Sequence, residues 1–396
     1  MEKIAYTNVL KKRNFFLLWL ACAITSFGDS LSTIALIGLI VWFTKGAKEI
    51  NMMWLMLSLL IPQIVFGPIA GVFVDRWRRK WIMIASDLIR GILVFLIIFT
   101  QATYQVFVIA FLVSLVDIFF FPARSSFLPN IVDKKELIVA NPLLSSTQEF
   151  MNLIGPAIGG VIIGFFGIKS LFVIDALTFL LSATAILFIS IKEESKEEKM
   201  GIKPLFLELK EGIGCIKTSQ KVSFICFVFG AMMIAGGAIN LILPIFVSEI
   251  LHKGTAEFGF LMSANGLGII IGSLLGGRLA QRINKIKLIT FAVILCGINS
   301  VIFALNPLYL IGLFLFVING LSNGLWEVSA TTLLQEETDD RNRGKVFSVV
   351  GAITGSTNIF SSGISGILAK ILGVKVLFLG AGLFMSIVGI LGKIRR

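Results

Sequence analysis

The stretch GPIAGVFVDRWRRK, residues 67–80, joins two long apolar runs at about residues 50–74 and 82–100. Its glycines, Gly67 and Gly71, stand one helical turn apart, a spacing that lets a second helix approach closely within a membrane. The charged residues from Asp75 to Lys80 end the first run as a turn that must face water. Because each flanking run is about the length of a helix that crosses ~30 Å of hydrocarbon, the segment predicts a hairpin of two membrane-spanning helices.

Similar apolar runs recur along the whole chain, of which 56% is apolar and only 15% charged, with a mean hydropathy of +0.94. A soluble protein of this composition would expose large apolar patches to water. The sequence therefore predicts an all-α membrane protein. Twelve spans are expected, at residues 14–43, 50–74, 82–100, 104–123, 138–167, 170–191, 222–248, 258–280, 286–305, 307–334, 346–369 and 373–392.

The basic residues predict how this chain is oriented. Of the 35 lysines and arginines, 28 fall in the turns of one side, six fall on the other, and Arg90 lies within a span. Because turns rich in lysine and arginine stay on the cytoplasmic side, we expect a multi-pass protein of the cell membrane with both termini in the cytoplasm. The same bias accounts for the net charge of +12 without a nucleic-acid partner.

The chain divides into two similar halves around one long polar segment, Lys192 to Lys221. At a shift of 205 residues, Gly67, Gly71 and Lys80 match Gly272, Gly276 and Lys285 in the second half. A shift of 206 matches Asp133 and Lys135 with Asp339 and Arg341. We therefore expect a six-helix half at residues 1–191, a cytoplasmic loop at 192–221 and a second six-helix half at 222–396, an architecture of secondary transporters.

The segment 67–80 resembles the signature loop of the major facilitator superfamily, in the form found in its drug and siderophore exporters. The resemblance implies twelve helices in two pseudo-symmetric halves and a charged cytoplasmic gate, although a plain positive-inside cluster is an alternative. The expected gating residues are Gly67, Gly71, Asp75, Arg76, Arg79, Asp87 and Arg90. Asp87 and Arg90, three residues apart, are expected to form an ion pair near Asp75.

Three further segments strengthen the resemblance. GPAIGG at residues 155–160 looks like the antiporter motif of the superfamily, in which Gly155, Pro156, Gly159 and Gly160 would bend the fifth span. Tight helix packing is the alternative role. PARSSFLP at 122–129 and RGKVFS at 343–348 are similar to the macrolide-efflux and siderophore-exporter branch. One departure is that residues 107–116 lack the arginine that many drug antiporters carry early in the fourth span.

The resemblance implies a proton antiporter that exports amphipathic or hydrophobic small molecules, acts as a monomer among membrane lipids and uses no cofactor. A lipid transporter of the same superfamily is the alternative, and a non-transporting receptor or intramembrane enzyme is the alternative from another class. The sequence has no nucleophile paired with a base, no phosphate-binding loop, and a single histidine, His252. Neither an enzyme nor a metal site is therefore expected.

Carboxylates within the spans are the candidates for proton coupling, because each charge in mid-membrane costs roughly 2.5 to 3.5 kcal/mol and needs a partner or water. Asp29 and Glu149 are expected to lie deepest, and Asp117, Glu327 and Asp175 nearer to the helix ends. Structural roles are the alternatives: Asp29 could bond to nearby hydroxyl groups, and Glu149 to neighbouring amides.

The charge distribution generates a prediction of topology. Cysteines introduced at the expected outer positions should react with an impermeant maleimide in intact cells, whereas those at the expected cytoplasmic positions should react only after the membrane is opened. The outer positions are Lys45, Lys169, His252 and Lys375, and the cytoplasmic ones are Arg78, Lys135, Lys196, Arg282 and Arg341. Reversed labelling in either half would contradict the pairing of the two halves.

Overall fold

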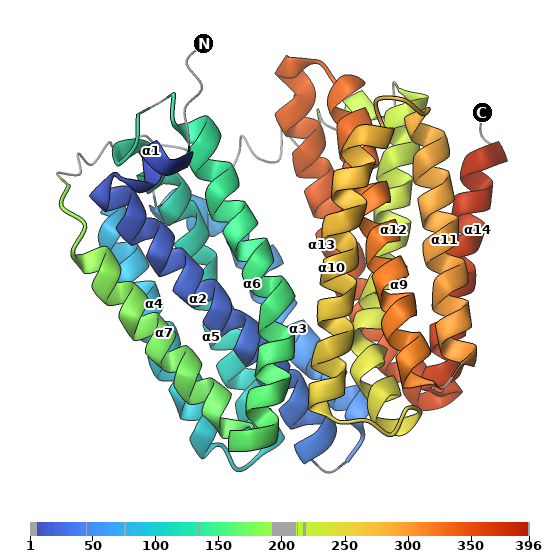
Figure 1. Ribbon diagram of the computed structural model, residues 1–396, viewed down its shortest axis with the longest axis horizontal. Helices are drawn as coiled ribbons and strands as arrows, with labels where there is room; N and C mark the ends of the chain where they lie inside the picture. The colour runs from blue at the N-terminus through green and yellow to red at the C-terminus, as the bar shows by residue number, and fades with distance from the viewer. Residues whose placement is uncertain are drawn as a thin grey trace. The chain divides into compact units, whose positions relative to one another are not determined.

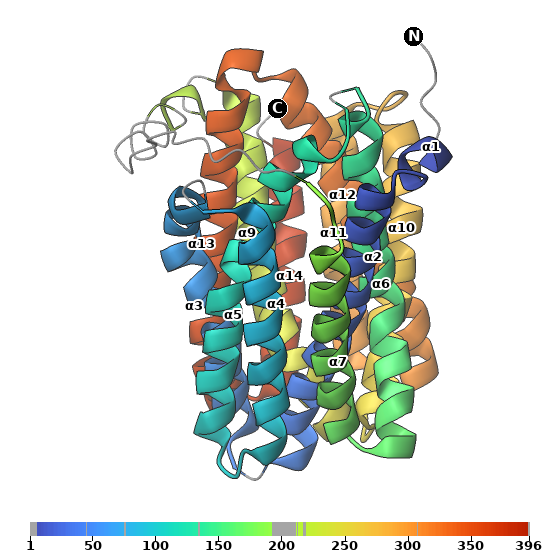
Figure 2. The same cartoon turned by 90° about the vertical axis from the view of Figure 1, so that its left-hand side faces the viewer.

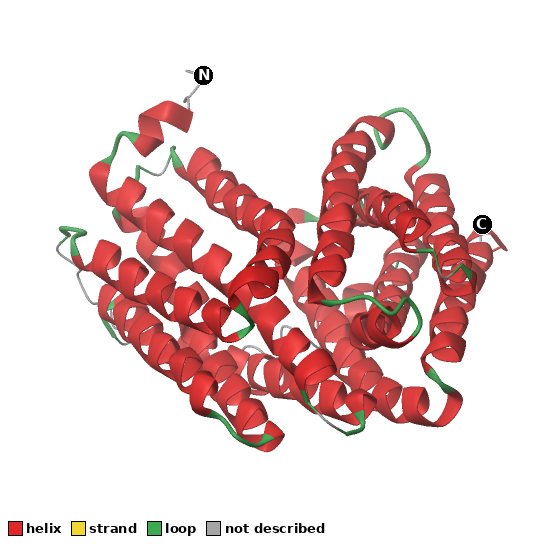
Figure 3. Ribbon diagram, turned by 60° about the horizontal axis from the view of Figure 1, so that its bottom comes forward, coloured by secondary structure: helices red, strands yellow, loops and turns green. Residues whose placement is uncertain are grey.

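The computed structural model describes residues 6–44, 46–74, 77–133, 135–191, 211, 213–216, 219–306 and 308–394. Every regular element in these ranges is helical, and short turns connect the helices (Figure 3). The predicted central loop lies largely outside the described residues, as do Asp75 and Arg76 of the expected gate, Lys45 and Lys196.

The long helices follow the predicted spans closely (Figure 1). They are α2 (Arg13–Gly38), α3 (Lys48–Val74), α4 (Arg79–Leu96), α5 (Thr103–Phe127), α6 (Leu137–Phe166), α7 (Lys169–Leu187), α9 (Gln220–Glu249), α10 (Thr255–Leu279), α11 (Lys285–Leu305), α12 (Tyr309–Glu336), α13 (Asp340–Leu372) and α14 (Val374–Ile394). A short helix, α1 (Tyr6–Leu10), precedes α2, which continues as a π-helical segment at Leu39–Phe43.

Eleven of the described helices are long and apolar enough to cross a bilayer. The exception among the predicted spans is α13, which has 33 residues but carries many hydroxyl and amide groups between Thr354 and Ser365. The structure thus confirms an all-helical membrane fold, and the twelfth span stays a prediction.

The described chain forms two compact units. The first comprises residues 1–39 and 58–202, and the second comprises residues 40–57 and 203–396. The sequence division assigns residues 40–57 to the first half, whereas packing groups them with the second. Contacts of Lys48 contribute to this grouping. Its Nζ lies 3.5 Å from Glu249 Oε1 and 3.1 Å from Ser248 Oγ. Gly366 of α13 also lies directly against Met53 of α3.

In the first unit, α2 packs against α6 and α7, and α4 packs against α5 and α7 (Figure 2). At one end of this unit Lys12 donates hydrogen bonds to Asp133 (2.7 Å) and Glu136 (2.6 Å), which ties the start of α2 to the turn before α6. These bonds raise the pKa of Lys12 and lower that of Asp133. Asp133 is largely exposed, so solvent screens this pair.

A glycine with a positive φ closes the same turn in both halves. Gly167 (φ 77°) joins α6 to α7, and Gly373 (φ 86°) joins α13 to α14. The two positions are 206 residues apart, the shift that also relates Asp133 to Asp339. An L-residue with a side chain rarely adopts this conformation, so a glycine here allows the abrupt reversal between the helices.

In the second unit, α10 and α12 approach so closely that their backbones touch. A Cβ added at Gly272 would lie 2.8 Å from Leu321 Cα, and one added at Gly320 would lie 2.8 Å from Ile269 N. The glycines of this segment therefore serve helix packing, as the sequence indicated. Gly67, which matches Gly272 in the first unit, is packed less closely. A Cβ added at Gly67 would meet no described atom within 4 Å.

This packing predicts unequal effects of two substitutions on one helix. Gly272→Ala should lower stability by about 1–3 kcal/mol, because the new methyl group overlaps the α12 backbone. Gly277→Ala is the matched control, since a Cβ there meets nothing within 4 Å and alanine is the better helix former. Thermal unfolding of the purified variants measures the difference, and equal midpoints would contradict the close approach.

Candidate functional site

The centre of the first unit holds a buried cation, Arg90 of α4, whose side chain is 3% exposed. Its Nη2 donates to Asp87 Oδ1 at 2.7 Å, and its Nη1 donates to Asp117 Oδ1 of α5 at 2.5 Å. The guanidinium also lies over the rings of Phe120 (4.9 Å) and Phe179 (4.5 Å). Two carboxylates and two aromatic faces thus compensate for the loss of water around this charge.

Asp87 connects this cation to a third helix. Its second carboxylate oxygen, Oδ2, accepts a hydrogen bond of 2.6 Å from Ser182 of α7. The side chain is fully buried, and both of its oxygens have partners. The predicted ion pair between Asp87 and Arg90 is therefore present, but it lies at the middle of α4 and binds α4, α5 and α7 together. The expected position of this pair near Asp75 stays a prediction, because Asp75 lies outside the described residues.

A second group of polar side chains links α2 to α7. Ser32 donates a short hydrogen bond to Asp175 Oδ2, and Thr178 donates to Asp175 Oδ1 at 3.1 Å. Asp175 is completely buried. Its side chain is out of reach of water because α2 covers it: Gly28 leaves no room for a side chain between the two helices. Asp175 stands in the first two turns of α7, and its expected place toward a helix end stays a prediction.

Asp29 follows Gly28 on α2 and differs from its neighbours. Its carboxylate accepts no hydrogen bond from the residues that the structure describes, and the side chain is exposed. Thr33 donates instead to the backbone oxygen of Asp29, at 2.8 Å. Asp29 nevertheless interacts electrostatically with Arg90 and with the carboxylates of Asp87, Asp117 and Asp175. We call Arg90 and these four carboxylates the charge cluster.

The glycines of the 155–160 motif lie beside this cluster. A Cβ at Gly155 would overlap Ser30 Oγ, and one at Gly159 would come within 3.2 Å of Leu31 and Leu171. The motif therefore packs α6 against α2 at the residue that follows Asp29. This is the packing role that the sequence left open, and α6 runs without a break through Pro156. A bend at this proline stays a prediction.

The other predicted residues lie apart from the cluster. Glu149 is exposed on α6, and Glu327 is exposed on α12 of the second unit. Of the expected gate, Arg79 begins α4 and its Nε is buried without a described partner.

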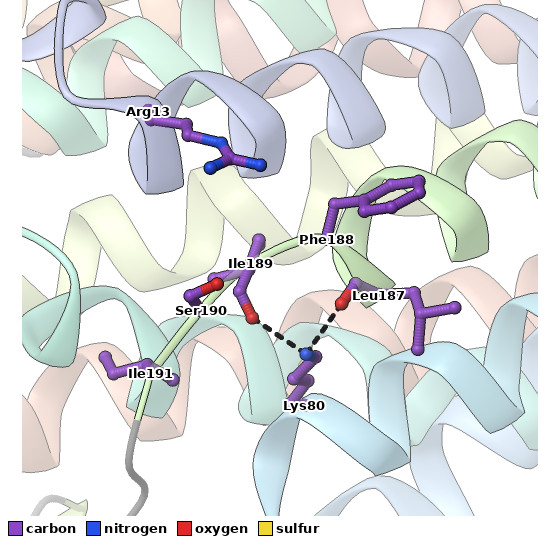
Figure 4. Close-up of a pocket in the computed structure, with 7 residues that line it drawn as sticks. All are labelled: Arg13, Lys80, Leu187, Phe188, Ile189, Ser190 and Ile191. Carbon is purple, nitrogen blue, oxygen red and sulfur yellow. Dashed lines mark hydrogen bonds between the residues drawn. The ribbon is translucent and has the colours of Figure 1, made fainter.

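Lys80, the next residue, caps a helix. Its Nζ donates to the backbone oxygens of Leu187 (2.8 Å) and Ile189 (2.7 Å), at the carboxyl end of α7 (Figure 4). A cation at this end of a helix satisfies carbonyls that have no partner within the helix. Its repeat counterpart, Lys285, instead forms an ion pair of 2.9 Å with Glu336. The matched lysines thus occupy the same place in the sequence repeat but have different partners.

Comparison with known proteins shows that this chain is similar to membrane transporters. The model of a family described as transmembrane secretion effector matches residues 5–396. The chain is 26% identical over 402 residues to macrolide efflux protein A of Streptococcus pyogenes, an alignment that covers 98% of this chain and 96% of that protein. It is also 26% identical over 412 residues to an uncharacterised MFS-type transporter, YfiS, of Bacillus subtilis (strain 168), covering 100% and 95% of the two chains.

Solved structures show the same fold. A crystal structure of the nucleoside transporter NupG matches with a TM-score of 0.75 and 13% sequence identity, covering 96% of this chain and 98% of that one. At this identity the likeness concerns the fold alone.

The charge cluster generates a prediction about stability. Arg90→Met should destabilise the protein by about 3–5 kcal/mol, because it leaves Asp87 buried without its cation. The double variant Asp87→Asn/Arg90→Gln should recover part of this loss. Lys221→Met is the control, since Lys221 pairs with Glu337 where both side chains are accessible, and such pairs contribute about 0–1 kcal/mol. Thermal midpoints followed by tryptophan fluorescence test this order, and an equal loss in Arg90→Met and Lys221→Met would contradict it.

Proposed function

Because the chain belongs to the transmembrane secretion effector family of the major facilitator superfamily, we propose that it exports amphipathic or hydrophobic small molecules in exchange for protons. The chain is a membrane transporter and not an enzyme, as its family and its named relatives indicate. Export of hydrophobic cargo is supported by the likeness to a macrolide efflux protein over nearly the whole chain. A protein that alternates between an inward-open and an outward-open state would let protons enter as cargo leaves.

The observation that carries the proposal is the imbalance of charge around Arg90. The carboxylates of Asp87 and Asp117 pair with one guanidinium, and those of Asp29 and Asp175 interact with it electrostatically from a greater distance. Closely spaced like charges oppose one another, so binding of a proton at one of these carboxylates would relieve part of their repulsion. Proton exchange requires a site that binds protons in the middle of the membrane and whose access to water differs between the two states.

Within the cluster we assign the exchanged proton to Asp29. Asp87 and Asp175 have hydrogen-bond partners on both oxygens, and Asp117 bonds to Arg90, whereas the Asp29 carboxylate has no such bond from the described residues. Its chain neighbours, Gly28 and Ser30, touch α7 and α6. A small shift of α6 against α2 would therefore change the surroundings of Asp29 first.

Glu149 is the second candidate for the exchanged proton. It is an exposed carboxylate on α6, six residues before Gly155, the glycine that packs against α2 beside Asp29. A movement of α6 would carry Glu149 with it. Asp117, Asp175 and Glu327 are the remaining candidates.

Transport by the purified protein in proteoliposomes tests the function. A proton gradient should drive uphill movement of a macrolide, whereas a sodium gradient of the same size should not. The panel includes catecholate siderophores and lysolipids, because residues 122–141 also resemble lipid transporters of the superfamily. Movement of lysolipid alone, or dependence on sodium, would contradict proton-driven export of drug-like cargo.

Coupling is tested by neutral variants of the two candidate carboxylates. Asp29→Asn and Glu149→Gln should retain cargo exchange without a gradient but lose gradient-driven export, because cargo still binds while the proton no longer does. Glu337→Gln, which alters an accessible ion pair outside the cluster, is the control and should export at the wild-type rate. Uphill export at the wild-type rate in both variants and in their double mutant would remove these residues from coupling.

A further inference from the structure

An open pocket of about 590 Å³ lies at one end of the first unit, where three helices begin or end. Arg13 is the first residue of α2, Lys80 is the second residue of α4, and the segment 187–191 includes the end of α7. All of these residues line the pocket (Figure 4). No aspartate or glutamate is present among the described residues of its wall, so the pocket carries two positive charges without a carboxylate.

Hydrogen bonds to the segment 187–191 hold the pocket from two sides. Asn14 Nδ2 donates to the backbone oxygen of Ser190 at 2.9 Å, and the backbone N–H of Ser190 donates to Asn14 Oδ1 at 3.3 Å. Lys80 donates to the backbone oxygens of Leu187 and Ile189. The start of α2 and the start of α4 are therefore both attached to the same short segment, and the two cations keep their places beside it.

The charge of Arg13 is available to a ligand. The preceding residue, Lys12, is engaged with Asp133 and Glu136, whereas the side chain of Arg13 makes no hydrogen bond or ion pair with any residue that the structure describes. The Arg13 side chain is exposed. A guanidinium presents its N–H donors in a planar fork that matches the oxygens of a phosphate group. A phosphate in the pocket can therefore accept two hydrogen bonds from Arg13 at once.

The second unit has a pocket at the corresponding helix starts, but carboxylates of the chain neutralise its cations. Lys221 of α9 and Lys285 of α11 line this pocket, which has a volume of about 310 Å³. Lys221 pairs with Glu337 at 2.6 Å, and Lys285 pairs with Glu336 at 2.9 Å. The shift of 206 residues places the neutral Asn130 at the position of Glu336. The first half therefore lacks this counterion, and an external anion can take its role.

The pocket of the first unit lies at the depth of lipid headgroups. Candidate membrane spans begin at Arg13 and Arg79 and end at Leu187. Trp81, beside Lys80 in the sequence, is 53% exposed, and tryptophan is enriched where hydrocarbon meets water. Phe188 of the pocket wall is 59% exposed, so a membrane would bring lipid against it. The two cations thus stand at the boundary of the hydrocarbon, where phospholipids carry their phosphate groups.

We propose that this pocket binds the headgroup of an anionic phospholipid, with Arg13 donating to the phosphate oxygens and Lys80 supplying a second positive charge. The acyl chains lie along the exposed apolar side chains of Leu187 and Phe188. The distribution of basic residues predicts that this end of the helices faces the cytoplasm. Basic pockets between helices on that side suit anionic headgroups, and the anionic lipids of that leaflet supply them. The proposal is independent of the cargo and of proton coupling.

Native mass spectrometry of the full chain, released from detergent micelles of defined lipid content, tests the proposal. The probes are phosphatidylglycerol and phosphatidylcholine with the same acyl chains, and inorganic phosphate in lipid-free micelles. Wild-type protein should retain one phosphatidylglycerol with about fivefold higher affinity than phosphatidylcholine, the size expected for one basic residue acting on one net negative charge. Inorganic phosphate should neither remain bound nor displace the lipid, because it lacks the acyl chains.

Arg13→Gln should lower the affinity for phosphatidylglycerol by about fivefold and leave that for phosphatidylcholine unchanged. Lys11→Gln is the matched control, because it removes the same charge two residues earlier from an exposed side chain that does not line the pocket. It should bind as the wild type does. Arg13→Lys should recover part of the affinity, since it restores the charge but not the planar fork.

Three results would overturn the inference. Equal affinities of the wild type for the two lipids would show that the pocket does not select an anionic headgroup, and this comparison needs no variant to fold. An equal effect of Arg13→Gln and Lys11→Gln, or no effect of either, would show a diffuse attraction to the surface. Displacement of phosphatidylglycerol by inorganic phosphate would show a site for the free anion. Thermal midpoints of the variants, expected to equal that of the wild type, separate lost binding from lost folding.

Discussion

A guanidinium without water around it is the constraint on which the first unit depends. Removing Arg90 from solvent is costly, and the cost is met only where carboxylates from different helices converge on it. Asp87 of α4 and Asp117 of α5 supply them, and Ser182 of α7 fixes the orientation of Asp87. The ionic contacts therefore determine which helices can be neighbours, and apolar packing fills the space between them. Phe127 and Ile186 are among the fully buried side chains that do so.

The two units keep one helical plan but use different polar chemistry inside it. The first holds a cation with an excess of carboxylates, whereas a cavity of the second is lined by apolar side chains together with the amides of five asparagines, Asn240, Asn265, Asn299, Asn319 and Asn323. Charge responds to protons, and neutral amides respond to the shape and hydrogen bonding of a ligand. A sequence repeat can thus conserve helix ends and turns, as Gly167 and Gly373 do, while the interiors diverge toward separate tasks.

Local features of the sequence predicted much of this arrangement. Apolar runs located the helices, and a spacing of three residues predicted the pair of Asp87 with Arg90. Partners distant in the chain could not be predicted, because they depend on which helix faces come together. Ser32 and Asp175 are 143 residues apart, and no local pattern connects them. The hydrogen bond that Asn323 donates to Asn319 was also missed, although two asparagines one turn apart in one expected span were a signal that could have been found.

The polarity of α13 has a consequence for how the protein is made. Its serines at 361, 362 and 365 are buried, and Ser361 donates a hydrogen bond to the backbone oxygen of Ile234 in α9. Before those contacts exist, the same hydroxyl groups face lipid and oppose insertion. Gly373 joins α13 directly to α14, whose strongly apolar sequence follows within one residue. The hydroxyl groups of α13 therefore become favourable only once α9 packs against them, so this helix depends on the rest of the second unit for its place in the fold.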